Sequence, residues 1–122
     1  MIKCLIVGLG GFIGSILRYL IGLLPIGSKI NFPLKTLIIN IVGSFIIGTV
    51  VAIALKDKEV SEELALFLKV GICGGFTTFS SFAFESFDLF NKGEFIVVLS
   101  YILISVVFSI LAIALSQYLI IR

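Results

Sequence analysis

No histidine occurs among the 122 residues of this sequence, which excludes an imidazole base, a histidine-ligated metal and a histidine proton relay. The two cysteines, Cys4 and Cys73, both lie inside apolar stretches, where cysteine behaves as a small hydrophobic residue. Two such residues are too few for a disulfide framework or a thiolate metal site. The composition therefore excludes chemistry that depends on imidazole or on several thiolates.

Charged residues are also scarce, at 13% of the chain, whereas a soluble domain has about 25%. Hydrophobic residues make up 60% of the chain, and its mean hydropathy is +1.29. So few polar residues cannot form the water-facing surface that would enclose a hydrophobic core. The composition therefore indicates a membrane protein with a single domain. The formal charge of +2 is too small to suggest that the chain binds nucleic acid.

Four long apolar segments account for almost the whole sequence. A helix that crosses the hydrocarbon core of a bilayer needs about 20 mostly apolar residues. We therefore predict an all-α membrane protein, a single domain over residues 1–122, with four transmembrane helices. Their expected ranges are 2–24, 33–55, 64–90 and 95–121. Short polar segments connect the helices, and Ser61 is placed to cap the start of the third one.

Lysine and arginine residues are divided almost evenly between the two ends of these helices. The end with both termini has Lys3, Lys56, Lys58 and Arg122, and Lys69 if it points outward. The opposite end has Lys29, Lys35 and Lys92, and Arg18 if it reaches that interface. Since Lys/Arg asymmetry fixes orientation, this chain can insert both ways up, and two oppositely oriented copies can pair. The alternative is that a small bias is enough to select one orientation.

The third span contains a segment that disfavours a continuous helix. Residues 71–82 read GICGGFTTFSSF, and adjacent Gly and Thr residues are poor helix formers. We predict a break near residues 74–78 that divides the span into two half-helices. Such a break frees backbone carbonyls, which can hold a small cation, and exposes the positive N-terminus of the second half. The alternative is a continuous helix whose glycines serve packing.

A concentration of aromatic residues begins within the predicted break. Phe76, Phe79 and Phe82 recur every three residues and are expected to share one face. Ring edges carry partial positive charge and can meet an anion edge-on, although such a stripe is more often core or lipid contact. Glu85 needs a polar partner or an interface, and Arg18 or a backbone donor are the candidates. Arg18 itself either reaches the headgroups or gives a pore mouth a positive potential.

Two polar tracks run along otherwise apolar helices. With 100° per residue, one track covers about 140° of the second span and the other about 80° of the fourth. The first consists of Thr36, Asn40, Gly43, Ser44 and Gly48, and the second of Tyr101, Ser105, Ser109 and Ser116. These tracks either line a pathway or mediate contacts between helices. Small residues four apart support packing or dimerisation; the pairs are Gly10/Gly14, Ser44/Gly48 and Gly71/Gly75.

Three segments together resemble the signature blocks of the Fluc-type (CrcB-like) fluoride channel family. They are GGFIGSILRY at 10–19, NIVGSF at 40–45 and GGFTTFSSF at 74–82, of which the third is the most specific. The blocks occur in the order of the family, in a chain of matching length. The resemblance implies an antiparallel, dual-topology homodimer with two fluoride pathways and a central Na⁺ at the dimer interface.

The same resemblance implies, by motif position, which residues form the site. The backbone carbonyls of Gly74 and Thr77 of each chain would hold the Na⁺. Phe79 and Phe82 would be the pair of rings along the fluoride pathway, and Asn40 the essential amide donor.

Other polar residues extend this pathway in the resemblance. Arg18 would be the vestibule cation, and Glu85 the acid that follows the aromatic pair. The serines of the third block would supply hydroxyl donors, and the family often has Thr where this chain has Ser81. The remaining pathway residues would be Ser80, Ser81, Tyr101, Ser105 and Ser109.

The implied function is passive fluoride export across the cell (inner or plasma) membrane by a multi-pass protein, which relieves fluoride toxicity. Fluoride is strongly hydrated, so it leaves water only where several donors replace its hydration shell together. One alternative is a small four-helix multidrug or cation exporter, which needs an intramembrane acid, and Glu85 is the one candidate. Another is a non-conducting membrane assembly protein, which would explain the glycine pairs and not the polar tracks.

Overall fold

The computed structural model describes residues 1–122 and contains helices and short connections only. The prediction of an all-α protein is confirmed, because four helical stretches are long and apolar enough to cross a membrane. The first two are α1 (Ile2–Gly22) and α2 (Leu34–Lys56). The third is composite, and the fourth is α6 (Phe95–Ile121). The parts of the third are α3 (Glu62–Leu66), the π-helix η1 (Phe67–Cys73), α4 (Gly74–Phe76) and α5 (Phe79–Asn91).

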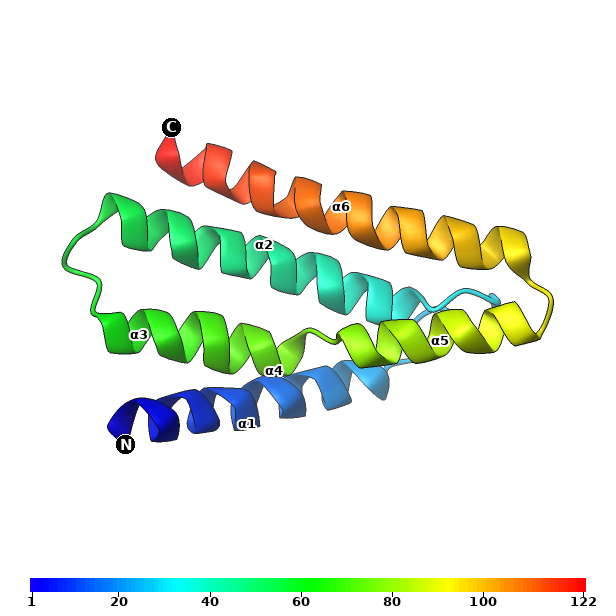
Figure 1. Ribbon diagram of the computed structural model, residues 1–122, viewed down its shortest axis with the longest axis horizontal. Helices are drawn as coiled ribbons and strands as arrows, with labels where there is room; N and C mark the ends of the chain where they lie inside the picture. The colour runs from blue at the N-terminus through cyan, green and yellow to red at the C-terminus, as the bar shows by residue number, and fades with distance from the viewer.

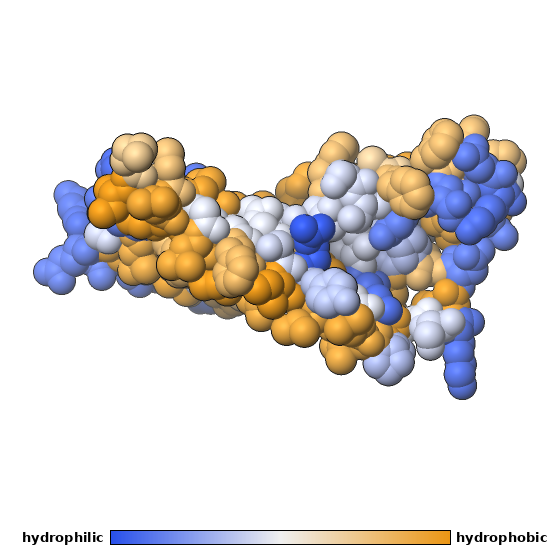
Figure 2. Space-filling model, turned by 90° about the horizontal axis from the view of Figure 1, so that it is seen from below, coloured by the Kyte–Doolittle hydropathy of each residue, from blue (hydrophilic) through white to orange (hydrophobic).

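The four stretches lie side by side and alternate in direction, so both termini are at the same end of the molecule (Figure 1). Helix α2 packs mainly against α6, and α1 packs mainly against η1 and α4. The third stretch thus lies between the α1 side and the α2–α6 pair. Figure 2 shows hydrophilic residues gathered at the two ends, with a mostly hydrophobic or neutral band between them. This distribution is the one expected of a protein that spans a bilayer.

The third stretch is interrupted at two residues, which is a narrower break than the predicted 74–78. Thr77 and Thr78 are extended, with φ/ψ of −75°/159° and −149°/118°. Gly74, in contrast, is helical, with φ −64° and ψ −38°. Gly75 lies in the short helical segment α4 against Gly11 of α1, and the two threonines that follow α4 take the extended backbone. The sequence did not predict the π-helical turns that precede the break.

Two of the small-residue pairs bring α1 into backbone contact with the third stretch. A Cβ atom added to Gly10 would lie 2.6 Å from the Phe67 carbonyl oxygen and 2.8 Å from the Gly71 Cα. A Cβ on Gly75 would lie 2.5 Å from the Gly11 carbonyl oxygen. Glycine is therefore required here for close packing within one chain.

The first prediction concerns this contact. Changing Gly10 to Ala is expected to lower the free energy of unfolding by about 1–3 kcal/mol, because the new methyl group meets rigid backbone. Gly8→Ala is the matched control, since a Cβ there has nothing within 4 Å. Denaturant titration of the purified protein in detergent micelles measures both. Equal stability of the two variants would contradict the packing role of Gly10.

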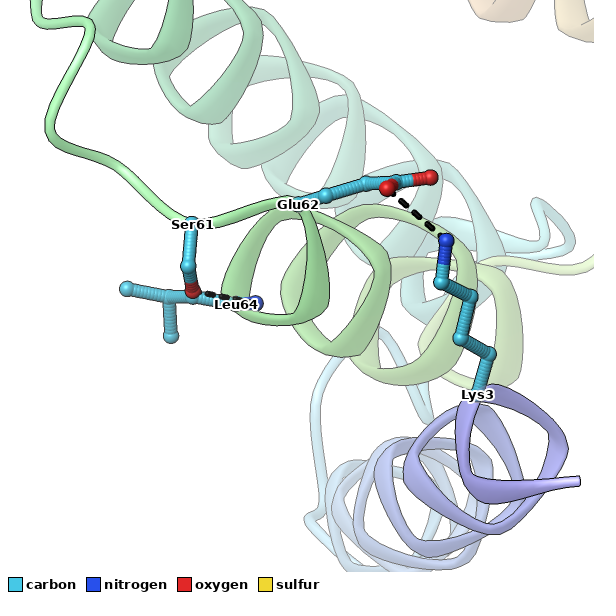
Figure 3. A network of polar contacts seen from close by, with 4 residues as sticks. All are labelled: Lys3, Ser61, Glu62 and Leu64. Atoms are coloured by element: carbon cyan, nitrogen blue, oxygen red, sulfur yellow. Dashed lines mark hydrogen bonds and ion pairs between the residues drawn. The ribbon is translucent and has the colours of Figure 1, made fainter.

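Two polar contacts lie at the end of the molecule that holds both termini, and Figure 3 draws them. The Leu64 amide donates to the Ser61 hydroxyl at 3.2 Å, so the predicted N-cap of the third stretch is confirmed. Lys3 Nζ forms an ion pair with Glu62 Oε2 at 2.8 Å, which joins α1 to α3. Both side chains are at least half exposed, so solvent screens the two charges and the ion pair adds little to stability.

Candidate functional site

The break in the third stretch is held by one side chain of α2. Asn40 Nδ2 donates to the Thr78 carbonyl at 3.0 Å, and the Thr78 amide donates to Asn40 Oδ1 at 2.9 Å. The side-chain amide thus replaces both hydrogen bonds that a helix would give this extended residue. An asparagine amide has two N–H groups, so one remains free to donate elsewhere.

Rearranged hydrogen bonds leave two carbonyls at the break without their regular helical donors. The Thr78 amide donates to Asn40 and not to the Gly74 carbonyl, four residues before it. The Ser81 amide donates to Thr78 Oγ1 at 3.1 Å and not to the Thr77 carbonyl. Backbone oxygens freed in this way are suitable ligands for a small cation.

Arg18 of α1 lies against the same break. Its Nε donates to the Gly75 carbonyl at 3.2 Å, and the side chain is half-buried. The arginine therefore satisfies the C-terminal end of the first half-helix from a neighbouring helix, as basic groups do at helix ends. Its positive charge is held close to the break instead of extending freely to the headgroups.

Glu85 has partners other than the two that the sequence analysis offered, Arg18 and a backbone donor. The Thr36 hydroxyl donates to Glu85 Oε1 at 2.6 Å, and the Tyr101 hydroxyl donates to Oε2 at 2.8 Å. These contacts connect α5 to α2 and α6. Since Tyr101 is fully buried, at 0% exposure, the carboxylate is stabilised by two neutral hydroxyl donors inside the protein.

A second prediction follows from this cluster. Tyr101→Phe is expected to lower the free energy of unfolding by about 1–3 kcal/mol, because one carboxylate oxygen loses its donor in a buried position. Tyr118→Phe removes the same hydroxyl from a ring that is 57% exposed, and a change within about 0.5 kcal/mol is expected there. Denaturant titration compares the two. A loss of the same size in both variants would argue against a stabilising Tyr101–Glu85 bond.

The aromatic residues separate into two groups at the break, so the expectation that three of them share one face is wrong. Phe76 is buried between α1 and α2, where it lines a separate pocket with Leu17 and Ile46, and its ring lies against Gly43. Phe79 and Phe82 lie on the other side, with ring centroids 5.7 Å apart. The extended Thr77–Thr78 segment changes the rotation of the chain, so a spacing of three no longer keeps residues on one face.

A cavity of about 450 Å³ lies between α2, the third stretch and α6. It brings the two polar tracks together, through Asn40, Gly43, Ser44, Ser105 and Ser109. The third stretch contributes residues from both sides of the break, namely Lys69, Cys73, Gly74, Thr77, Thr78, Phe79 and Phe82. The Ser105 hydroxyl is buried and has no hydrogen-bond partner within the chain. The cavity therefore offers amide and hydroxyl donors beside two aromatic rings.

Several predicted site residues lie outside this cavity. Ser80 is exposed, with its hydroxyl 3.4 Å from the Thr78 hydroxyl, and Ser81 contributes its amide to the cap described above. Tyr101 contacts the Phe82 ring, at 5.1 Å between centroids, and bonds to Glu85. Ser116 of the second track is buried against Gly48 and donates to a carbonyl of its own helix. That residue serves the packing of α6 on α2.

Comparison with known proteins places the chain in a family. The sequence profile described as "CrcB-like protein, Camphor Resistance (CrcB)" matches residues 5–117. This chain is a member of the CrcB-like family.

Relatives of this CrcB-like chain are similar over nearly their whole length. The protein named "Fluoride-specific ion channel FluC" from Agrobacterium fabrum is 46% identical over 114 residues, covering 93% of this chain and 91% of the relative. One of the same name from Azobacteroides pseudotrichonymphae is 40% identical, covering 96% and 94%. "Fluoride-specific ion channel FluC 1" from Methanosarcina acetivorans is 41% identical, covering 96% and 89%.

Two residues of this CrcB-like protein have structural roles that are not predicted from the sequence. Thr78 is the N-cap of α5 and the backbone partner of Asn40, and a Thr that precedes a helix is a recognised capping signal. Lys69, which the sequence suggests only as a charge pointing outward, lines the cavity. No motif indicates this position, because the cavity forms only when α2, the third stretch and α6 pack together.

Proposed function

We propose that this CrcB-like protein is a fluoride-selective channel, a passive conductor and not an enzyme. The observation that carries the proposal is the cavity beside the break, where the free N–H of Asn40 and the hydroxyls of Ser105 and Ser109 accompany the rings of Phe79 and Phe82. Donors of graded strength replace the hydration of a small anion without trapping it. The names of the relatives in three organisms support fluoride as that anion.

The direction of flow follows from the membrane potential. A negative interior of about 100 mV drives an anion outward with roughly 2.3 kcal/mol per charge. We assign the protein to the cell (inner or plasma) membrane, where it relieves the toxicity of fluoride that enters as neutral HF and dissociates inside.

The contacts of Glu85 favour this channel over a proton-coupled exporter. Both of its carboxylate oxygens accept hydrogen bonds from hydroxyls, and no acidic residue lines the cavity. An exporter of cationic compounds needs an accessible acid in the membrane for proton exchange.

The proposed function is tested with purified protein in liposomes loaded with fluoride. A fluoride electrode should record rapid release when a K⁺ ionophore removes the charge imbalance, and chloride should not be released at a comparable rate. Absence of fluoride release, or equal release of chloride, would overturn the proposal.

We further propose that two chains assemble as an antiparallel, dual-topology homodimer. The nearly even Lys/Arg tally at the two ends supports insertion in both orientations. Residues that line the cavity are exposed in the single chain, including Phe79 at 78%, and a second chain would cover them. Labelling a cysteine placed at Lys58, in a chain with Cys4→Ala, tests the orientation in cells. Modification from one membrane side only would contradict dual topology.

We also propose a Na⁺ site at the dimer interface, formed by the Gly74 and Thr77 carbonyls of both chains. The fit rests on the two carbonyls that lack their regular helical donors. The chain has no group of three or more His, Cys, Asp or Glu residues that could hold a metal, and neutral backbone oxygens are ligands that suit a monovalent cation. A bound Na⁺ would supply positive charge that offsets the carbonyl dipoles. Replacing Na⁺ by N-methylglucamine should lower the unfolding temperature, and an unchanged temperature would contradict the site.

A further inference from the structure

Lys69 is the only charged residue among those that line the cavity. It belongs to η1, is exposed, and forms no ion pair or side-chain hydrogen bond within the chain. The other charged residues of the third stretch form ion pairs or hydrogen bonds, or they lie near its ends. Lys3 pairs with Glu62, Glu85 binds two hydroxyls, and Asp88 pairs with Lys92. Lys69 therefore carries an uncompensated positive charge beside the cavity.

The position of Lys69 along the helix is intermediate between the polar end and the break. It lies seven residues after Glu62, which corresponds to about 10 Å of helix, and eight residues before Thr77. Ser44 and Ser109 of the neighbouring helices line the same cavity, with the apolar Ile47 and Ile113. A lysine at this depth is expensive in hydrocarbon and needs access to water, and Lys69 is exposed at the wall of the cavity.

We propose that Lys69 concentrates the permeating anion at the mouth of the cavity that faces the end with both termini. This proposal rests on the proposed channel function, and it assigns to Lys69 a role in supplying fluoride to the donors near the break. A charge of one sign in a cleft with low-dielectric walls raises the local concentration and the entry rate of an oppositely charged ion. In an antiparallel pair, the two copies of Lys69 would serve opposite membrane faces.

The expected increase in the rate of fluoride entry comes from the charge of Lys69. The test therefore varies the charge, the ionic strength and the position of the charge separately. Lys69→Gln should reduce the fluoride efflux rate by about three- to tenfold at ~20 mM salt. The reduction should disappear near 1 M of an impermeant salt such as potassium isethionate, where the Debye length is about 3 Å. Lys69→Arg should keep the rate of the unmodified chain, and Lys69→Glu should fall below Lys69→Gln. Lys58→Gln is the matched control, because it removes the same charge from the exposed loop at the same end.

Two results overturn the inference while leaving the channel intact. One is an efflux rate for Lys69→Gln that equals that of Lys58→Gln at low salt. The other is a loss that persists at 1 M salt or also appears in Lys69→Arg, because a structural role would give that pattern. If the unmodified chain itself releases no fluoride, the proposed function fails. Measuring the unmodified chain before its variants separates this outcome from a failure of the Lys69 inference alone.

Discussion

Fluoride efflux is expected to fall by about a hundredfold when Asn40 is changed to Asp. Hydrogen bonds to a charged group contribute about 1.5–3 kcal/mol, and the carboxylate has no N–H to donate to the ion. It also places a negative charge on the proposed pathway of the anion. The acceptor half of the contact with Thr78 is retained, because a carboxylate oxygen still accepts the Thr78 amide. The liposome assay with a fluoride electrode measures the change.

The control for this variant is Asn31→Asp, the same chemical change in an exposed part of the connection between α1 and α2. That variant should release fluoride at the rate of the unmodified chain. Asn40→Asp also removes the donor to the Thr78 carbonyl, so its unfolding curve and elution volume are compared with those of the parent. A folded Asn40→Asp protein with undiminished efflux would remove this amide from the pathway.

The second large effect is expected for the aromatic pair. Phe79→Ile and Phe82→Ile should each reduce efflux by more than about tenfold, since isoleucine is apolar and lacks the positive ring edge that meets an anion. Both rings line the cavity, and the Phe82 ring also contacts Tyr101. The side chains that replace them are hydrophobic and only somewhat smaller, so the fold should be preserved.

Phe84 provides the matched control for this pair. It lies on the same helix, α5, and is 72% exposed, compared with 78% for Phe79, but it does not line the cavity. Phe84→Ile should therefore leave efflux unchanged. If all three variants lose activity equally, the cause is a general change in α5 and the rings have no specific role. Full activity of the Phe79 and Phe82 variants would exclude both from the pathway.

Much of the candidate site can be predicted from the amino-acid sequence, because its signals are local or belong to a motif. Asn40, Ser105 and Ser109 are polar residues in apolar spans, and the family resemblance identifies Phe79 and Phe82. All five line one cavity. The polar partners cannot be predicted in the same way, because they come from other helices. The donors to Glu85 are on α2 and α6, and the acceptor of Arg18 is on α4.

The membrane setting, the four spans and the interruption of the third one are dictated by the sequence. These properties follow from hydropathy and backbone preference, which depend on neighbouring residues along the chain. Packing between the helices, in contrast, confines the break to Thr77 and Thr78 and turns Phe76 away from Phe79. The reason is that the amide bonds of Asn40 and the glycine contacts with α1 join distant segments, and their geometry exists only once the helices pack.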